Sequence, residues 1–452
     1  MRGYIEQPRF SCALAAQQTV LAIPRAVPIA HCGPGCVGKT FAFSGLGAGH
    51  QGEGYAGGGN VTCTNTNEQD VVFGGEEKLT KFINGALKVI KSDLYVVLAG
   101  CTAGIIGDDV LQVSQDFAEE GKPVVGVDTS GFRGNSYVGH ELVVKEIIKQ
   151  FVDDFDLEVE VRKGLVNVFA SVPPQNPFWR GDLEEIKRIL ELLGLEVNIL
   201  FGTESAGVSE WKDIPNAQFN LVLNTWVGES TAKLLKTKYG TPYLHIPYLP
   251  TGAAATSRVI REIGAFAELD SAKVEKLIDK EEKRFYTYFT ALADFFADFR
   301  NSIPYELYLV ADSSYAIGVS DFVVNELGFT PEGIYITDPP SDKVGNQILE
   351  IFKGLGEEFE GKVVIEDDGG LIQEDIRKRL NGSKKAAIFG SLWEDMLADE
   401  TGNLHYHISI PMLNDVVINR SYVGYNGGLR LIEEIYSGIF RNRDVAGTTL
   451  VE

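Results

Sequence analysis

Short apolar runs and amphipathic segments alternate along most of the chain, and this alternation restricts the possible fold more than any other feature. Residues 94–99 form an apolar run typical of a buried strand, with helical periodicity on either side at residues 76–92 and 109–120. A second strand is predicted at residues 123–127. Since parallel strands need a crossover helix between them, the pattern predicts an α/β fold with a doubly wound parallel sheet.

The same rhythm restarts twice. Further strands are predicted at residues 166–170, 196–200, 219–223, 306–311, 334–337, 362–365 and 385–389. Helices are predicted at residues 183–193 and 228–239, and one long helix at 271–300 whose aromatic residues Phe285, Tyr288, Phe289 and Phe295 are expected to lie in the core. We therefore expect three Rossmann-like domains with parallel sheets: residues 1–160, residues 161–270, and residues 271–452, which include the linking helix.

Charge and hydropathy exclude several classes of protein. Acidic residues outnumber basic ones by 63 to 41 in the 452 residues, and the net charge of −22 argues against a nucleic-acid-binding protein. No run of 18 apolar residues occurs, and the first residues lack the apolar core of a signal peptide. The expected location is the cytoplasm.

Cysteine is confined to the first quarter of the chain, at positions 12, 32, 36, 63 and 101. In a reducing compartment this distribution favours metal or redox chemistry over disulfides. Cys36 lies in a glycine-rich turn and Cys101 follows a predicted strand, and such positions present ligands in α/β proteins. Three thiolates, from Cys12, Cys36 and Cys101, could converge on an iron–sulfur cluster, with the remaining ligands from another residue or chain. The alternative for each cysteine is a small buried apolar side chain.

A phosphate-binding loop is a second interpretation of the same region. Residues 33–40 match the pattern G-x-x-x-x-G-K-[ST], with Lys39 and Thr40 at its end. That mechanism needs a helix beginning at the Lys-Thr pair, whereas Thr40 leads into a poor helix former and then into residues 45–59, a glycine-rich segment predicted to be a loop. A P-loop ATPase stays open as an alternative.

Several motifs together resemble one family, the component 1 proteins of nitrogenase and the nitrogenase-like reductases. Residues 31–36, His-Cys-Gly-Pro-Gly-Cys, are similar to the family's first glycine-cysteine motif, and Cys101 with Ile106-Gly107-Asp108-Asp109 is similar to its third cluster cysteine. The likeness extends through residues 64–75, 131–136, 176–183 and 410–428 and covers nearly the whole chain.

The resemblance implies an α₂β₂ heterotetramer with an iron–sulfur cluster of the P-cluster type, 8Fe-7S or 4Fe-4S, shared between two subunits. By position, Cys12, Cys36 and Cys101 would be the ligands from this chain. The partners would be an α-type component 1 subunit and an iron protein, the reductase that hydrolyses ATP and supplies electrons. ATP hydrolysis would then lie outside this chain.

The same resemblance indicates the β-type subunit, which passes electrons on and has no catalytic cluster of its own. The α-type chain ligates that cluster through a mid-chain cysteine and a late histidine, whereas this sequence has no cysteine after Cys101 and has Asn414 at the histidine position. His405 and His407 are out of register and are expected to be satisfied or exposed.

Three further residues lie next to the predicted cluster ligands or to the matching motifs. Cys32 and Cys63 are expected to be buried side chains, although either could be an extra ligand or a redox-active thiol. Ser130 is next to the position of a cluster-binding serine in nitrogenases, but the register favours Gly131.

Residues 22–29 and the compact N-terminus resemble more closely the branch of the family outside nitrogen fixation. Within that branch the preferred identity is a methylthio-alkane reductase. A true nitrogenase β subunit, a tetrapyrrole-reducing relative and a cofactor-assembly scaffold are the alternatives.

Overall fold

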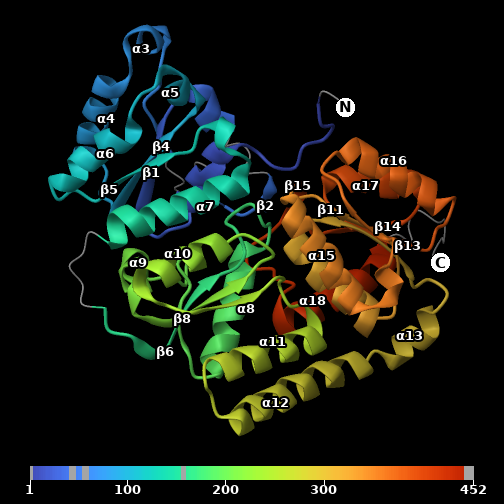
Figure 1. The fold of residues 1–452 in the computed structure, drawn as a ribbon. Helices are drawn as coiled ribbons and strands as arrows, with labels where there is room; N and C mark the ends of the chain where they lie inside the picture. The colour runs from blue at the N-terminus through green and yellow to red at the C-terminus, as the bar shows by residue number, and fades with distance from the viewer. Residues whose placement is uncertain (1–3, 40–46, 53–60, 154–158, 442–452) are drawn as a thin grey trace, which may run out of the picture.

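The computed structural model describes residues 4–39, 47–52, 61–153 and 159–441 (Figure 1). Within these ranges the strands form three parallel sheets of four, four and five strands, and one separate two-stranded pair. Helices cover the faces of the sheets, so the predicted α/β class with parallel sheets is confirmed.

The first sheet has the strand order β3-β1-β4-β5. Its strands are β1 (Ala26–His31), β3 (Thr62–Cys63), β4 (Leu94–Ala99) and β5 (Val124–Asp128). Strands β1 and β4 are buried along their whole length because helices cover both faces. These helices are α4 (Glu76–Val89) and α6 (Val110–Glu119) on one face, and α1 (Gln17–Leu21) and α7 (Ser136–Ile147) on the other.

Short helical segments gather at the carboxyl edge of this sheet, and all but the first of them follow a strand that ends there. They are η1 (Ala13–Ala16), residues 34–39, α3 (Glu68–Phe73), α5 (Cys101–Ile106) and η3 (Gly131–Arg133). The segment η1 reaches the same edge through backbone bonds, since Ala13 N–H donates to the Gly134 carbonyl at 3.0 Å.

The second sheet has the order β7-β6-β8-β9. Its strands are β6 (Arg162–Phe169), β7 (Glu196–Asn198), β8 (Ala217–Leu223) and β9 (Tyr243–Ile246). The segment between the first two sheets is the π-helix η4 (Ile148–Val152). The helices of this part are α8 (Trp179–Leu192), α9 (Val208–Asp213), η5 (Ile214–Asn216), α10 (Glu229–Tyr239) and α11 (Gly252–Phe266).

The third sheet has the order β12-β11-β10-β13-β14. Its strands are β10 (Glu306–Ala311), β11 (Thr330–Ile336), β12 (Val363–Ile365), β13 (Ala386–Gly390) and β14 (Leu404–His407). Its helices are α14 (Ser313–Ser320), η6 (Asp321–Glu326), α15 (Asp342–Leu355), η7 (Glu357–Phe359), α16 (Gly369–Leu380) and α17 (Leu392–Thr401).

The long helix predicted at residues 271–300 is two helices, α12 (Ser271–Thr290) and α13 (Ala293–Phe299). The Thr290 hydroxyl donates to the carbonyls of Tyr286 and Thr287, and Leu292 N–H closes a tight turn on Phe289. Phe285 is buried as predicted, but Tyr288 is 59% exposed and does not belong to the core.

Part of the glycine-rich segment is a strand, which corrects the loop predicted at residues 45–59. Strand β2 (Ala48–His50) pairs in parallel with β15 (Met412–Val416), and the rest of the segment lies largely outside the described residues. Gly49 has a φ of +84°, and a Cβ there would stand 2.7 Å from Val417, so only glycine permits this approach. The pair joins the N-terminal part of the chain to its C-terminal part.

Each large sheet falls within one of the three predicted domains, but the division into domains stays a prediction. The largest hydrophobic core continues from the first sheet into the second and third. In addition, the last helix, α18 (Gly424–Arg441), packs on α8, α11 and α12, which precede the third sheet. Among the described residues, no helix combines the length and apolarity needed to cross a bilayer.

Candidate functional site

Cys12, Cys36 and Cys101 come together at the carboxyl edge of the first sheet. Cys12 has an extended backbone immediately before η1, Cys36 lies in the helical segment after β1, and Cys101 is the first residue of α5, after β4. Because the strands are parallel, residues distant in sequence meet at this edge.

Gly131 lies between two of the three thiols. Its N–H donates to Cys101 Sγ at 3.1 Å. A Cβ on Gly131 would stand 2.9 Å from Cys101 Sγ, closer than Cβ atoms normally approach, and would touch Cys12 Cβ at 3.4 Å. Glycine thus lets the backbone approach both cysteines and supplies a hydrogen bond to a sulfur atom.

Cys36, the third thiol, interacts electrostatically with Cys12 and Cys101. Partial desolvation of its sulfur raises the pKa of Cys36, and the thiols of Cys12 and Cys101 raise it further by Coulombic repulsion. A cation placed among the three sulfurs would relieve this repulsion, because metal ions bind the thiolate form.

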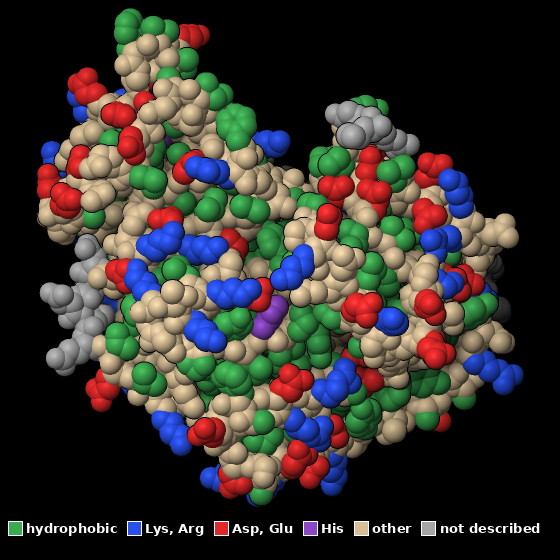
Figure 2. All heavy atoms as spheres, in the orientation of Figure 1, with side chains coloured by type: hydrophobic (Ala, Val, Ile, Leu, Met, Phe, Trp, Pro, Cys, Tyr) green, Lys and Arg blue, Asp and Glu red, His purple; other side chains and the backbone are tan. Residues whose placement is uncertain are grey.

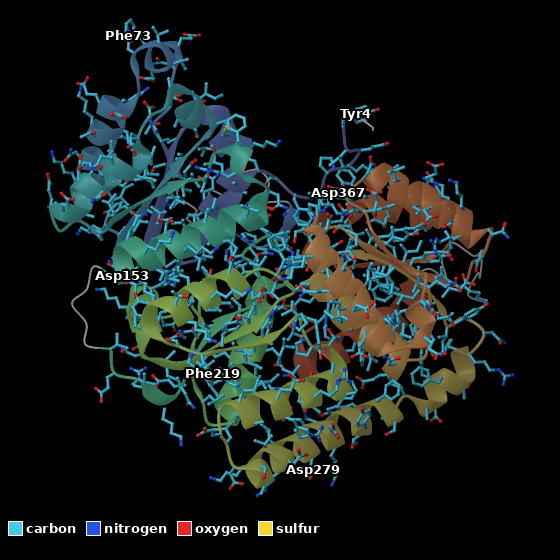
Figure 3. The ribbon with its side chains drawn as sticks, viewed as in Figure 1. Tyr4, Phe73, Asp153, Phe219, Asp279 and Asp367 are labelled. Atoms are coloured by element: carbon cyan, nitrogen blue, oxygen red, sulfur yellow. The ribbon has the colours of Figure 1, made fainter. Side chains whose placement is uncertain are left out.

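The site is open to solvent on one side. Cys12 and Cys36 are exposed and Cys101 is partly buried. Large apolar side chains on neighbouring segments are also exposed: Phe73 on α3 by 83%, Ile105 on α5 by 72% and Phe132 on η3 by 71%. Figure 2 shows apolar side chains at the tip formed by α3, where Figure 3 labels Phe73. Exposed apolar groups around an open site are typical of a surface that a partner covers.

The residues present suit a polynuclear iron–sulfur cluster better than a single ion. Among the residues that the structure describes, no three His, Cys, Asp or Glu side chains are close enough to hold one metal ion. A cluster instead takes each thiolate on a different iron, and hydrogen bonds to its sulfurs set its potential. Three cysteines with a backbone donor at Cys101 match that requirement.

Cys32 and Cys63 lie beside this group. Cys32 is fully buried, as predicted, and its thiol is within hydrogen-bonding distance of the sulfurs of Cys36 and Cys63. Cys63 is only partly buried. The Cys32 thiol and the N–H of Asn65, at 3.3 Å, donate to the Cys63 sulfur and lower the pKa of Cys63 to about 6. The interaction with Cys63 and its own burial raise the pKa of Cys32 far above its usual value.

A buried histidine fixes the turns around the cysteines, a role that the sequence did not reveal. His31, at the end of β1, is fully buried, and its Nε2 and Nδ1 lie 2.9 Å from Asp108 Oδ2 and 2.9 Å from Thr64 Oγ1. Asp108 Oδ1 accepts the Gly75 N–H at 2.8 Å. The network links the residues after β1, β3 and β4, and its only sequence signal is the place of His31 next to Cys32.

The Ser130 side chain does not lie against the cysteine sulfurs. The Ser130 side chain faces Gly104, and Gly131 rather than Ser130 lies against the sulfurs.

The residues of the possible P-loop do not form a phosphate-binding loop. Residues 34–39 are helical, so Gly35 and Gly38 lie within a helix and not in the wrapped loop that a nucleotide phosphate requires. Thr40 lies outside the described residues.

The carboxyl edges of the second and third sheets face each other and are closed. Asn176 donates to Asp312 Oδ2 at 3.1 Å, Trp226 Nε1 donates to Asp338 Oδ2 at 2.8 Å, and the Tyr315 hydroxyl donates to Asp182. The cavity left beside Asp312 measures about 10 Å³, room for about one water.

Burial determines the ionisation of these closed edges. Desolvation, with repulsion from Asp338, raises the pKa of Asp312 to about 8, and desolvation raises the pKa of Asp182 to about 6. A carboxyl group such as Asp312, whose pKa lies above neutrality in a filled interior, is typical of structural packing when no cavity admits a substrate.

A larger cavity, of about 530 Å³, lies between α8 and α18 and has no chemistry of its own. Its arginines are already paired: Arg188 with Glu185, Arg420 with Asp415 and Arg430 with Glu434. This pairing leaves little positive charge to attract an anionic ligand.

His405 and His407, expected to be satisfied or exposed, are mostly buried and only partly satisfied: each Nδ1 lies beside a carboxylate, and each Nε2 lacks a partner. Their side chains are 8% and 13% exposed, and the Nε2 atom of each is buried without a hydrogen-bond partner. Asn414 lies on β15.

Comparisons with known proteins agree over nearly the whole chain. The family model described as nitrogenase component 1 type oxidoreductase matches residues 11–440. The nitrogenase molybdenum-iron protein beta chain of Methanococcus maripaludis is 24% identical, over 97% of this chain and 95% of its own length. A polypeptide of the light-independent protochlorophyllide reductase of Chaetosphaeridium globosum is 24% identical, over 83% of this chain and 73% of its own.

A solved structure has the same fold. The structure titled "Nitrogenase Cp1 at pH 6.5" superposes with a TM-score of 0.78 at 20% identity, covering 100% of this chain and 98% of its own.

Proposed function

Because the chain belongs to the nitrogenase component 1 type oxidoreductases, we propose that it is the β-type subunit of a nitrogenase-like reductase. In this proposal Cys12, Cys36 and Cys101 hold one half of a P-type iron–sulfur cluster, and a partner subunit supplies the other half. The observation that carries the proposal is the approach of Cys12 and Cys101 to Gly131 at an open sheet edge, with Cys36 near enough to both for their charges to raise its pKa.

The chain's own residues would hold the cluster and adjust its surroundings. A bound iron–sulfur cluster supplies one-electron transfer. The three thiolates would be its ligands, and the Gly131 N–H would withdraw charge from the Cys101 sulfur. The buried Cys32 thiol would do the same at Cys36. His31 and Asp108 keep the surrounding turns in place.

Two observations support the β-type role. The chain has no cysteine after Cys101 and has asparagine at position 414, so it lacks the late ligands expected of the catalytic subunit. The edges of the second and third sheets, where α/β proteins commonly bind a substrate, are filled by Asp312, Trp226 and Tyr315. Catalysis is therefore assigned to the partner subunit.

The exposed apolar residues around the cysteines support two partners, an α-type subunit and an ATP-hydrolysing iron protein. Val72 and Phe73 on α3, Ile105 on α5 and Phe132 on η3 are exposed on the segments at this sheet edge and would lose solvent on assembly. The helical state of residues 34–39 supports the assignment of ATP hydrolysis to the iron protein and not to this chain.

For the reaction, we propose reductive cleavage of a carbon–sulfur bond in methylthio-alkanes. Two electrons and two protons would convert R–S–CH₃ to R–H and methanethiol. The support is the likeness of residues 22–29 to the branch of the family outside nitrogen fixation. Electrons would pass from the iron protein through the shared cluster to the active-site cluster of the partner.

The cluster assignment is tested on the chain co-purified anaerobically with its partner. The wild-type complex is expected to be brown and to contain iron, and Cys36→Ala is expected to lose most of the iron of the shared cluster. Lys39→Ala is the matched control, because it removes the lysine of the P-loop pattern three residues away and should leave iron unchanged. Iron-free, colourless and stable wild-type complex contradicts the proposal, as does loss of nucleotide binding by this chain in Lys39→Ala.

The substrate is tested by adding iron protein, ATP and reductant to the same complex. Methanethiol release from a methylthio-alkane supports the proposal. Reduction of dinitrogen or of a tetrapyrrole in its place overturns the substrate and keeps the relay role. A complex with bound iron and no ATP-dependent turnover of any of these substrates identifies an assembly scaffold.

A further inference from the structure

Two imidazoles on β14 have nitrogen atoms that lack partners. His405 and His407 are two residues apart on a strand, so their side chains project from the same face. Their ring centroids are 4.7 Å apart and the ring planes are nearly perpendicular, at 87°. Both Nε2 atoms are buried without a hydrogen-bond partner, which is a costly arrangement for two polar atoms.

The opposite nitrogen of each ring faces a carboxylate. His405 Nδ1 lies 3.4 Å from Asp395 Oδ1 on α17, and His407 Nδ1 lies 3.6 Å from Asp415 Oδ1 on β15. Asp415 also pairs with Arg420 at 2.6 Å, which helps to keep its carboxyl ionised. Carboxylates at Nδ1 favour the tautomer with the proton on Nδ1, so each Nε2 keeps its lone pair.

This arrangement has the features of a metal site with outer carboxylates. Histidines that bind metals commonly direct their second ring nitrogen toward a carboxylate, which orients the ring and raises its basicity. Two imidazoles that bind one Zn²⁺ through Nε2, at about 2.0–2.1 Å with near-tetrahedral angles, place their ring centroids about 5 Å apart. The observed 4.7 Å is close to that separation.

We propose that His405 and His407 together bind one divalent transition-metal ion, Zn²⁺ in the first instance, through their Nε2 atoms. Imidazole nitrogens suit Zn²⁺, Co²⁺, Ni²⁺ and Cu²⁺ and do not select Mg²⁺ or Ca²⁺. Among the described residues no third His, Cys, Asp or Glu completes the set, so water fills the remaining positions. The site is independent of the cysteines of the first sheet and of the proposed electron relay.

The experiment uses the anaerobically purified complex and two probes, Co²⁺ and Zn²⁺. Co²⁺ bound to imidazoles gives a visible d–d absorption, and equilibrium dialysis with elemental analysis counts bound Zn²⁺. Wild type is expected to bind one additional metal ion per chain and to gain thermal stability with Zn²⁺.

The variant His405→Asn/His407→Asn is expected to lose this one metal ion and the Zn²⁺-dependent stabilisation, with its iron content unchanged. His245→Asn is the matched control, since His245 is a partly buried histidine whose Nε2 already lies 2.8 Å from the Asn224 carbonyl oxygen. Asp395→Asn keeps both imidazoles and is expected to weaken the affinity about 10–100-fold. It tests the site even if the double variant does not fold.

Two results would overturn the proposal. One is the absence of Zn²⁺ and Co²⁺ binding by wild type at about 1 mM metal, far above the free concentrations at which protein metal sites fill. The other is equal binding by wild type and by a folded His405→Asn/His407→Asn variant, or by Asp395→Asn if that double variant does not fold.

Discussion

The carboxyl edge of the first sheet and the facing edges of the second and third sheets are all formed by parallel strands. They differ in the residues that follow those strands. In the first sheet the strands lead into cysteines and glycines, and the site is open, with exposed side chains such as Ile105 and Phe132. In the other two sheets the strands lead into Asp312, Trp226 and Tyr315, which close the space between them. The strand architecture thus provides an edge, and the residues after each strand decide whether that edge can bind anything.

The electrostatics of the two regions differ in the same way. At the open edge, thiols repel one another and raise the pKa of Cys36, a cost that a bound cation would remove. At the closed edges, burial raises the pKa of Asp312 and Asp182, a cost that protonation removes without any ligand. The first arrangement would be stabilised by a bound cation, and the second needs no ligand because the chain's own side chains fill it.

The largest effect is expected from breaking the ion pair that links the segment before Cys12 to the third-sheet region. Arg9 forms a buried ion pair with Glu394 on α17, and Cys12 follows three residues later. Arg9→Met leaves the Glu394 carboxylate buried without its cation, which costs about 3–5 kcal/mol of unfolding free energy. Denaturant titration measures the loss, and the iron content is expected to fall as well, because Arg9 anchors the segment that carries Cys12.

Arg25→Met is the control for Arg9→Met, because the Arg25–Asp93 pair is exposed at 64% and 44% of its two side chains. Removing an exposed pair is expected to leave the unfolding free energy nearly unchanged, because solvent screens the two charges. Full iron content in Arg9→Met would show that Cys12 is positioned without help from the third sheet.

A smaller effect is expected from crowding the open edge. Gly131→Ala places a methyl group 2.9 Å from Cys101 Sγ and 3.4 Å from Cys12 Cβ. Overpacking of this kind costs about 1–3 kcal/mol, and here it acts on the thiols themselves. Iron content is expected to fall at least twofold.

Gly85→Ala is the matched control, since Gly85 lies in α4 and a Cβ there meets nothing within 4 Å. Alanine at this helical position is expected to stabilise the chain slightly and to leave iron unchanged. Equal iron content in Gly131→Ala and Gly85→Ala would show that Gly131 has no role in iron binding.

Much of the fold could be predicted from apolar periodicity, because buried strands have short continuous apolar runs. Strands β4 and β10 have the predicted bounds, residues 94–99 and 306–311. The runs that were missed lack this signal: β2 has three residues, one of them glycine, and α5 begins at Cys101 without an amphipathic pattern. Pairings such as β2 with β15 depend on tertiary contacts that local sequence does not record.

The candidate site could be predicted as residue types but not as geometry. The motifs around Cys36 and Cys101 mark them as unusual, and the family likeness groups them with Cys12. Neither source indicates that the Gly131 N–H reaches Cys101, nor that Asp108 binds His31, because these contacts join residues 30 and 77 positions apart. The Nε2 atoms of His405 and His407 were missed for the same reason, since burial is a property of the whole fold.

The closed edges are expected to give the protein a pH-dependent stability. The pKa of Asp312 is about 8 in the folded chain and near 3.9 in an unfolded one. The folded state therefore binds more protons between these values, and the unfolding free energy falls as the pH rises from about 4 to about 8, by at most about 1.4 kcal/mol per pH unit from this group. Asp312→Asn is expected to flatten this slope in denaturant titrations at pH 5, 6, 7 and 8. An unchanged slope would assign the dependence to other groups.

The smallest effect on stability is expected for the exposed apolar side chains at the carboxyl edge of the first sheet, which we call its rim. Phe132 is 71% exposed, so Phe132→Ala should change the unfolding free energy by no more than about 0.5 kcal/mol. If this rim is the contact surface of a partner, the same substitution lowers the fraction of chain that co-purifies with the α-type subunit or lowers electron flow from the iron protein. Val89→Ala is the control, because Val89 is also largely exposed, at 83%, but is the last residue of α4 and lies at the amino edge of the same sheet. An equal loss in both variants would mean that exposed apolar area in general, and not the carboxyl edge, determines assembly.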